Sequence, residues 1–306
     1  MEPHPKLGTR GSPLALAQAR KVASALEVAQ RWESGHIEIV AIKTKADKVQ
    51  DRPLAEIGGK ALWTKELDAA LLEGRTDFSV HSMKDVESER PKSIRIAAVR
   101  PRGDFRERLI GAKSLDALKK GAVVGTSSPR RKAQLLAVRP DLKVVPLRGN
   151  VDTRLKKVED GEVDATLLTA AGLRRLGMTN VGTPIAPEVM LPAPGQGVLG
   201  MECRTDDGMT ARMLGTVTDE ATYHALRAER AFVQALGATC HSPVAALALL
   251  EGGRLWLRAE LLAEDGSTKV SGEVRLACGE TKPARELARK LLKDAPEEIR
   301  KLFSPA

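Results

Sequence analysis

The sequence has few cysteines and few aromatic residues. Its 306 residues include three cysteines, Cys203, Cys240 and Cys278, and aromatic residues make up 3%. An odd number of cysteines without close pairing argues against a disulfide framework and a zinc site, so no metal is expected. Few aromatic residues argue against a nucleic-acid binder, because such proteins usually stack bases on aromatic side chains.

Long apolar runs are also missing. No stretch is long enough to span a bilayer, and the first residues, Met-Glu-Pro-His-Pro-Lys, lack the basic start and apolar core of a secretory signal. We therefore expect a cytoplasmic protein that does not bind membranes. Hydrophobic residues at 42% and charged residues at 29% are typical of a soluble globular protein, and the length predicts two or three domains.

Positive charge is in excess, with a formal net charge of +9 at pH 7. With so few aromatic residues to stack on bases, this charge fits a small polyanionic ligand better than a nucleic acid, provided that the arginines are clustered in motifs. They do gather, at the ends of several predicted strands.

The stretch from Thr76 to Val86 predicts a short strand whose end carries Lys84 and Asp85. Ligands of open α/β sheets lie at the carboxyl ends of strands, where a lysine can hold an anion and an aspartate can stabilise a developing cation. On this stretch alone, a helix-capping or solvated Asp85 explains the pattern equally well.

A similar arrangement is predicted at the first strand, Lys6 to Arg10. Ser12 and Pro13 are the residues expected at a helix start, and such a start binds anions. Capping alone explains Ser12 and Pro13 but not Arg10. A second strand over 36–43 is followed by a polar segment over 44–60, which we expect to be a mobile lid, and by a helix over 61–74.

Three further strand ends carry the same kind of motif. The predicted strands are 122–125, 144–147 and 164–169, and the polar residues that follow them are Thr126, Ser127, Ser128, Arg130 and Arg131, then Arg148 and Arg154, then Arg175. Each alone is compatible with a solvated face, but three in succession disfavour that interpretation. Paired arginines oppose the positive end of a helix dipole, and a bound anion would remove the conflict.

Two proline- and glycine-rich segments, 101–103 and 192–197, predict domain boundaries. We expect domain 1 to comprise 1–100 with 198–217, domain 2 to comprise 101–197, and domain 3 to comprise 218–306. Two chain crossings between domains 1 and 2 would form a hinge over a cleft.

The C-terminal part predicts a helix from Asp219 to Gly237, a three-stranded meander over 244–276 and a final basic helix over 284–303. Cys240 falls in the loop between the first helix and the meander. Cys203 falls in an apolar strand, where we expect a buried thiol.

These motifs together resemble the porphobilinogen deaminase family, also called hydroxymethylbilane synthases. The resemblance covers nearly the whole chain and rests on the following stretches in order: Thr9 to Gln18, Gly58-Gly-Lys60, His81 to Val86, Gly125 to Arg131, Leu147 to Arg154, Pro194-Gly-Gln-Gly197 and the Cys240 loop.

The resemblance implies a fold and a cofactor. The fold is α/β with three domains, the first two doubly wound and hinged like a periplasmic binding protein, the third a small three-stranded antiparallel sheet with helices. A dipyrromethane cofactor is expected on Cys240 through a thioether. The other implied cofactor contacts are Lys84, Ser128, Arg130, Arg131, Arg148 and Arg154.

The resemblance also implies a transferase of heme biosynthesis that condenses four porphobilinogen molecules and releases hydroxymethylbilane. Asp85 matches the catalytic aspartate, and the protein is expected to be a monomer. The implied substrate-binding residues are Arg10, Ser12, Gln18, Thr126, Ser127, Arg148 and Arg175. A two-lobed solute-binding or ligand-sensing protein for a small polyanion is the alternative, but it would not need Cys240.

Overall fold

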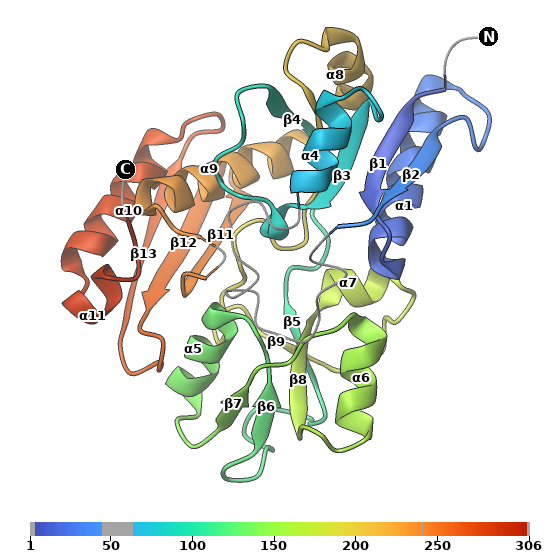
Figure 1. Cartoon of the computed structure of the whole chain (residues 1–306). Coiled ribbons are helices and arrows are strands. Elements are labelled where there is room, and N and C mark those ends of the chain that lie inside the picture. Colours follow the sequence, from blue (N-terminus) through green and yellow to red (C-terminus); the bar gives the residue numbers. More distant parts are fainter. Residues whose placement is uncertain (1–3, 45–63, 240, 305–306) are drawn as a thin grey trace. The chain divides into compact units, whose positions relative to one another are not determined.

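The computed structural model describes residues 4–44, 64–239 and 241–304, which hold three separate β-sheets (Figure 1). The chain divides into two compact units. One comprises residues 1–102 and 198–223, and the other comprises residues 103–197 and 224–306.

The first unit is built on a five-stranded mixed sheet of order β2-β1-β3-β10-β4. Its strands are β1 (Lys6–Arg10), β2 (Glu38–Ile42), β3 (Phe78–Ser82), β4 (Ile94–Val99) and β10 (Leu199–Arg204). β1 runs parallel to β2 and β3, whereas β10 pairs antiparallel with β3 and β4. The carboxyl ends of β1, β2 and β3 therefore meet at one edge of this sheet.

The helices of the first unit pack on this sheet through apolar stripes. They are α1 (Pro13–Gln30), α4 (Lys65–Leu72) and α8 (Gly208–Gly215), with a short 3₁₀ turn, η1 (Met83–Asp85), after β3. Val22 and Leu26 of α1 are buried at helical spacing against Phe78 of β3. Leu67 of α4 packs in a separate cluster with Ile42 of β2.

The second unit contains another five-stranded mixed sheet, of order β7-β6-β8-β5-β9. Its strands are β5 (Glu107–Ile110), β6 (Val123–Gly125), β7 (Lys143–Val145), β8 (Ala165–Thr169) and β9 (Thr183–Ile185). β6 runs parallel to β7 and β8, and β5 pairs antiparallel with β8 and β9. The helices that follow β6, β7 and β8 are α5 (Pro129–Val138), α6 (Val151–Glu159) and α7 (Ala170–Arg175) (Figure 1).

The C-terminal part of the second unit is a three-stranded antiparallel sheet covered by helices. Its strands are β11 (Val244–Glu251), β12 (Arg254–Leu262) and β13 (Lys269–Leu276). Its helices are α9 (Glu220–Leu236), which begins in the last residues of the first unit, α10 (Lys282–Asp294) and α11 (Glu297–Arg300). Phe232 of α9, Leu257 of β12 and Leu291 of α10 share one buried cluster.

The predicted α/β fold class is confirmed, and most predicted strands begin and end within two residues of the observed ones. The prediction of a single final helix was wrong. The backbone is extended at Ala295, because helical backbone is disfavoured at the position before a proline, and α11 begins after Pro296. Of the lid expected over 44–60, residues 45–60 lie outside the described residues, so the lid stays a prediction. The three-domain division stays a prediction. None of the helices in the described ranges is long and apolar enough to cross a membrane.

Candidate active site

The first unit brings two predicted motifs together at the carboxyl edge of its sheet. Arg10 is the last residue of β1, and Ser82 is the last residue of β3. Ser12 caps α1, since its Oγ accepts a hydrogen bond from the backbone N–H of Ala15 at 3.3 Å, and Pro13 is the first helical residue. The sequence signal for this helix start is confirmed.

A small cavity of about 60 Å³ lies at this edge. Its lining includes the predicted residues Arg10, Ser12, Gln18 and Asp85. Gln18 is 4% exposed, and its Nε2 donates to Oγ of Ser82 at 3.0 Å, which ties α1 to the end of β3. Residues separated by more than sixty positions in the chain thus meet at one place because β1 and β3 are adjacent parallel strands.

Asp85 is at the end of η1 and is exposed, whereas the flanking residues Met83 and Val86 are buried. The backbone N–H of Met83 donates to the carbonyl of Val198 at 3.0 Å. The buried flanks hold the turn in place and leave the Asp85 carboxylate at the cavity. Lys84, between them in the chain, is half-buried.

In the second unit, the segment from Gly125 to Ser128 connects β6 to α5. Ser128 caps α5 by accepting from the backbone N–H of Arg131 at 3.4 Å. Oγ of Ser127 donates to the carbonyl of Leu147 at 3.0 Å. A Cβ at position 125 would lie 2.8 Å from Cδ2 of Leu147, so only glycine allows the chain after β7 to approach β6 this closely.

Arg148 and Arg154 follow β7 on a glycine turn and the first turns of α6. Asn150 caps α6 by accepting from the backbone N–H of Thr153 at 2.8 Å. Nε of Arg154 donates to the carbonyl of Gly149 at 2.9 Å, and Gly149 has a φ of 114°, a left-handed conformation that favours glycine. The turn follows the carboxyl end of β7, which runs parallel to β6, and the Ser127 hydroxyl bonds to Leu147 just before it.

Arg175, in the last turn of α7, bonds to the predicted boundary segment. Its Nη2 donates to the carbonyl of Gly197 at 2.7 Å, and this carbonyl also accepts from the backbone N–H of Gly103 at 3.0 Å. Arg175 therefore joins the two connecting segments that the sequence identified as boundaries.

Arg130 and Arg131 share the carboxylate of Glu107, the first residue of β5. Oε1 of Glu107 accepts from Nη2 of Arg130 at 2.6 Å, and Oε2 accepts from Nη2 of Arg131 at 2.7 Å. The Glu107 side chain is fully buried and both arginines are nearly so. The anion that we expected at this helix start is thus present within the protein as an internal carboxylate.

Burial alone would raise the pKa of Glu107, but attraction by Arg131 and Arg130 and their hydrogen bonds lower it to about 2. Gln196, from the Pro194-Gly-Gln-Gly197 motif, donates through Nε2 to Glu107 at 3.2 Å and to the carbonyl of Phe105 at 2.7 Å. Sequence reasoning missed Glu107. The stretch Glu107-Arg-Leu-Ile110 has two charged residues followed by two apolar residues, so it shows no strand alternation that could have drawn attention to Glu107.

Among the cysteines that the structure describes, Cys203 is buried, as predicted, and Cys278 is exposed. Burial raises the pKa of the Cys203 thiol, which disfavours the thiolate needed for nucleophilic attack. Cys240 lies outside the described residues, so its predicted thioether stays a prediction.

The chain was compared with known proteins. Residues 6–212 match the family model "Porphobilinogen deaminase, dipyromethane cofactor binding domain", and residues 223–297 match "Porphobilinogen deaminase, C-terminal domain". A porphobilinogen deaminase of Sphingopyxis alaskensis is 48% identical over 305 residues, covering 98% of this chain and 96% of the relative. One of Paracoccus denitrificans is 46% identical over 298 residues, covering 96% and 95%.

A solved substrate-binding domain of a putative amino acid ABC transporter from Streptococcus pneumoniae is 14% identical, covers 69% of this chain and 90% of that chain, and gives a TM-score of 0.41.

The family matches and the three sheets define an α/β transferase with a dipyrromethane cofactor-binding domain. The chain belongs to the porphobilinogen deaminase family and has that family's activity, hydroxymethylbilane synthase.

The donor groups at the edge of the β7-β6-β8 sheet fit this cofactor, whose pyrroles carry acetate and propionate groups. Guanidinium groups and hydroxyls are the donors that carboxylates require. They are supplied here by Thr126, Ser128, Arg148 and Arg154, whereas the one O–H of Ser127 already donates to the carbonyl of Leu147. The individual roles of the predicted site residues stay predictions.

Proposed function

We propose that this chain condenses four porphobilinogen molecules head to tail, with loss of ammonia at each step, onto an enzyme-bound dipyrromethane, and then hydrolyses the product to release hydroxymethylbilane. The cofactor, when bound, supplies the pyrrole carbon to which the first substrate is joined. The observation that supports this proposal best is the cavity in the first unit, which is lined by Asp85 together with Arg10, Ser12 and Gln18.

In this proposal, Asp85 stabilises the positive charge that develops on the pyrrole when ammonia leaves, and it assists proton movement. Its exposed carboxylate at the cavity and the buried residues on either side of it suit this role, because an electrostatic partner is most effective when its position is fixed before the reaction.

The arginines and hydroxyls bind the carboxylates of cofactor and substrate. Arg10 and Ser12 supply them at the first sheet, and Arg148, Arg154 and Ser128 supply them at the second. We assign cofactor contacts first to Arg148 and Arg154, because Arg130 and Arg131 already share Glu107. Arg175 and Lys84 are the remaining proposed cationic contacts.

We further propose that the protein acts as a monomer in the cytoplasm and that its domains comprise residues 1–100 with 198–217, residues 101–197 and residues 218–306. The family matches imply porphobilinogen as the substrate.

The test of this function is an assay of the purified full chain with porphobilinogen. We expect ammonia and hydroxymethylbilane in a ratio of four to one, with the dipyrromethane retained on the protein after turnover. Ammonia release without a tetrapyrrole product, or consumption of the cofactor during turnover, would contradict the proposed reaction.

A further inference from the structure

Arg90, five residues after Asp85, gathers three carboxylates from three different segments of the first unit. Its Nε and Nη2 donate to the two carboxylate oxygens of Glu202 on β10, each at 2.9 Å. Nη2 also donates to Oδ1 of Asp68 on α4 at 2.5 Å, and Nη1 donates to Oε2 of Glu87 at 3.0 Å and Oγ1 of Thr64 at 3.3 Å. These bonds use all five N–H groups of the guanidinium.

This cluster is shielded from water. The side chain of Arg90 is 8% exposed, and that of Glu202 is fully buried. Burial alone would lower the pKa of Arg90, but attraction by Glu202 and the hydrogen bond to Asp68 raise it overall, so Arg90 stays charged. A bidentate arginine–carboxylate pair in a shielded place has a fixed geometry, which makes it a suitable anchor.

The histidine next to this cluster does not replace Arg90 as the counter-ion. Nε2 of His81 lies 3.3 Å from Oε2 of Glu202. Burial lowers the pKa of His81, although Glu202 opposes this effect. Arg90 is therefore the cation that compensates the buried Glu202 at neutral pH.

The segment from Ser82 to Arg90 is attached at both of its ends to β10 or to the residue directly before β10. At one end the backbone N–H of Met83 bonds to the carbonyl of Val198, directly before β10, and at the other end Arg90 bonds to Glu202 within β10. Asp85 lies between these two anchors.

We propose that Arg90 is a positioning residue for Asp85: by clamping the end of the segment that carries Asp85 to β10 and α4, it holds the carboxylate in its reactive position. This inference rests on the proposed catalytic role of Asp85. Arg90 itself lies outside the cavity lining and acts through Asp85 alone.

The test is a double-substitution cycle with Arg90→Met and Asp85→Asn in the full cofactor-loaded chain. We expect Arg90→Met to lower kcat roughly 10- to 100-fold with KM within about twofold, because small misplacements of a catalytic group are costly. In the Asp85→Asn background, Arg90→Met should lower kcat by less than about threefold, since the carboxylate that Arg90 positions is already absent. Arg90→Lys should lie between Arg90→Met and the wild type.

Two readouts do not depend on turnover. Intact mass should show the cofactor adduct on Arg90→Met, and backbone amides over residues 83–90 should exchange faster with solvent than in the wild type. Arg75→Met is the matched control, because it removes an exposed pair with Glu73 in the same unit. It should change neither kcat nor exchange.

If Arg90→Met does not fold, Asp68→Ala takes its place as the test variant. It removes only the bond between Arg90 and α4, and it should lower kcat about threefold to tenfold. Wild-type kcat in the folded variant, or equal losses from Arg90→Met in both backgrounds, would overturn the positioning role and leave the proposed function intact. Wild-type turnover in Asp85→Asn would remove Asp85 from the catalytic role and would overturn the positioning role of Arg90 with it, while the overall reaction would stand.

Discussion

Asp85 carries the chemical proposal at the scale of single residues. Replacing it with Asn keeps its shape and removes its charge, so the loss should fall on the chemical step. We expect kcat to fall roughly 100- to 1000-fold, the range seen when one preorganised electrostatic partner is lost. Because Asp85 is exposed, thermal unfolding should be nearly unchanged. Turnover within about tenfold of wild type would remove Asp85 from the catalytic role.

The buried Glu107 leads to a prediction about the stability of the folded protein at acid pH. Its pKa in the folded protein is about 2, against an ordinary 4.5. A depressed pKa means that the folded state favours the ionised form, so the contribution to stability is complete above 4.5 and is lost as pH falls through about 2. The shift corresponds to roughly 3 kcal/mol.

The free energy of unfolding, measured by urea titration at several pH values, should therefore fall more steeply for the wild type than for Glu107→Gln between about pH 5 and pH 2. Glu188→Gln removes a pair with Arg258 in which the glutamate is exposed to solvent, and it should follow the wild type closely. Parallel curves for wild type and Glu107→Gln would show that Glu107 is not held ionised by the two arginines.

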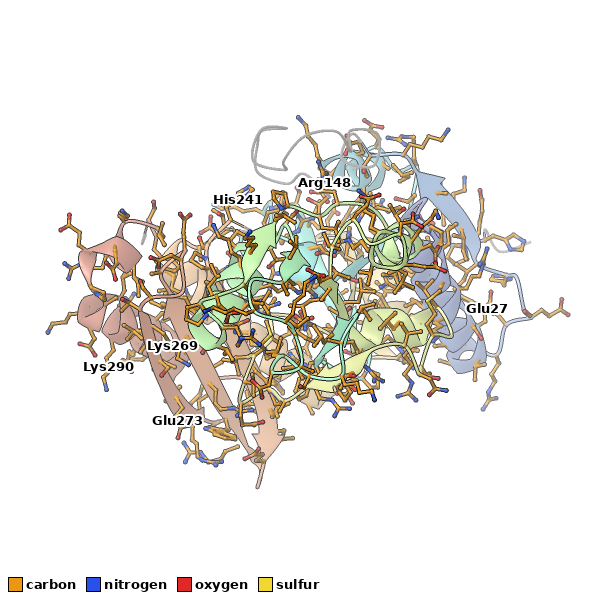
Figure 2. All side chains as sticks on the ribbon, turned by 90° about the horizontal axis from the view of Figure 1, so that it is seen from below. Glu27, Arg148, His241, Lys269, Glu273 and Lys290 are labelled. Carbon is orange, nitrogen blue, oxygen red and sulfur yellow. The ribbon has the colours of Figure 1, made fainter. Side chains whose placement is uncertain are left out.

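At the scale of elements, strand ends and the outer face of a helix carry the same kind of charge for different purposes. Arg148 follows β7 at the edge of a sheet, whereas Lys290 is exposed on α10, and Figure 2 shows them at well-separated places. We expect Arg148→Leu to reduce cofactor loading or turnover by about 30-fold or more, since it unpairs a partly desolvated carboxylate at a cost of about 2 kcal/mol or more.

Lys290→Leu is the matched control and should leave cofactor loading, measured by intact mass, and turnover within about twofold of wild type, because its charge is solvated. Equal effects of the two substitutions would mean that Arg148 contributes no more than any exposed positive charge, and would contradict its proposed binding of a polyanionic cofactor.

Elements were predictable from the sequence where local chemistry determines them. The starts of α1, α5 and α6 follow from Ser12, Ser128 and Asn150, whose side chains cap them. β5 and β9 were missed because their residues, Glu107-Arg-Leu-Ile and Thr183-Pro-Ile, show neither an apolar run nor alternation, and because both depend on antiparallel pairing with each other and with β8.

The candidate site was predictable only in part for the same reason. Arg130 and Arg131 stood out as charges in an unfavourable place at a helix start, but their partner Glu107 begins one of the missed strands. Arg90 and Glu202 are likewise brought together by the pairing of β3, β10 and β4, over a separation of 112 residues. Such tertiary pairs have no local signal.

At the scale of the whole molecule, the net charge of +9 is explained in this account by a polyanionic cofactor and product. Arginines of the predicted set occur in each of the two compact units. The cofactor that connects this charge to the chemistry is expected on Cys240, so the attachment of that cofactor is the central claim.

The most direct test is the intact mass of the purified wild-type protein followed by peptide mapping, with Cys240→Ala, Cys203→Ser and Cys278→Ser alongside. We predict a mass above that of the sequence by one dipyrromethane, mapped to Cys240, absent from a folded and inactive Cys240→Ala and retained in the other two variants. A wild-type mass equal to that of the sequence, an adduct on Cys203 or Cys278, or full activity in Cys240→Ala would contradict the account.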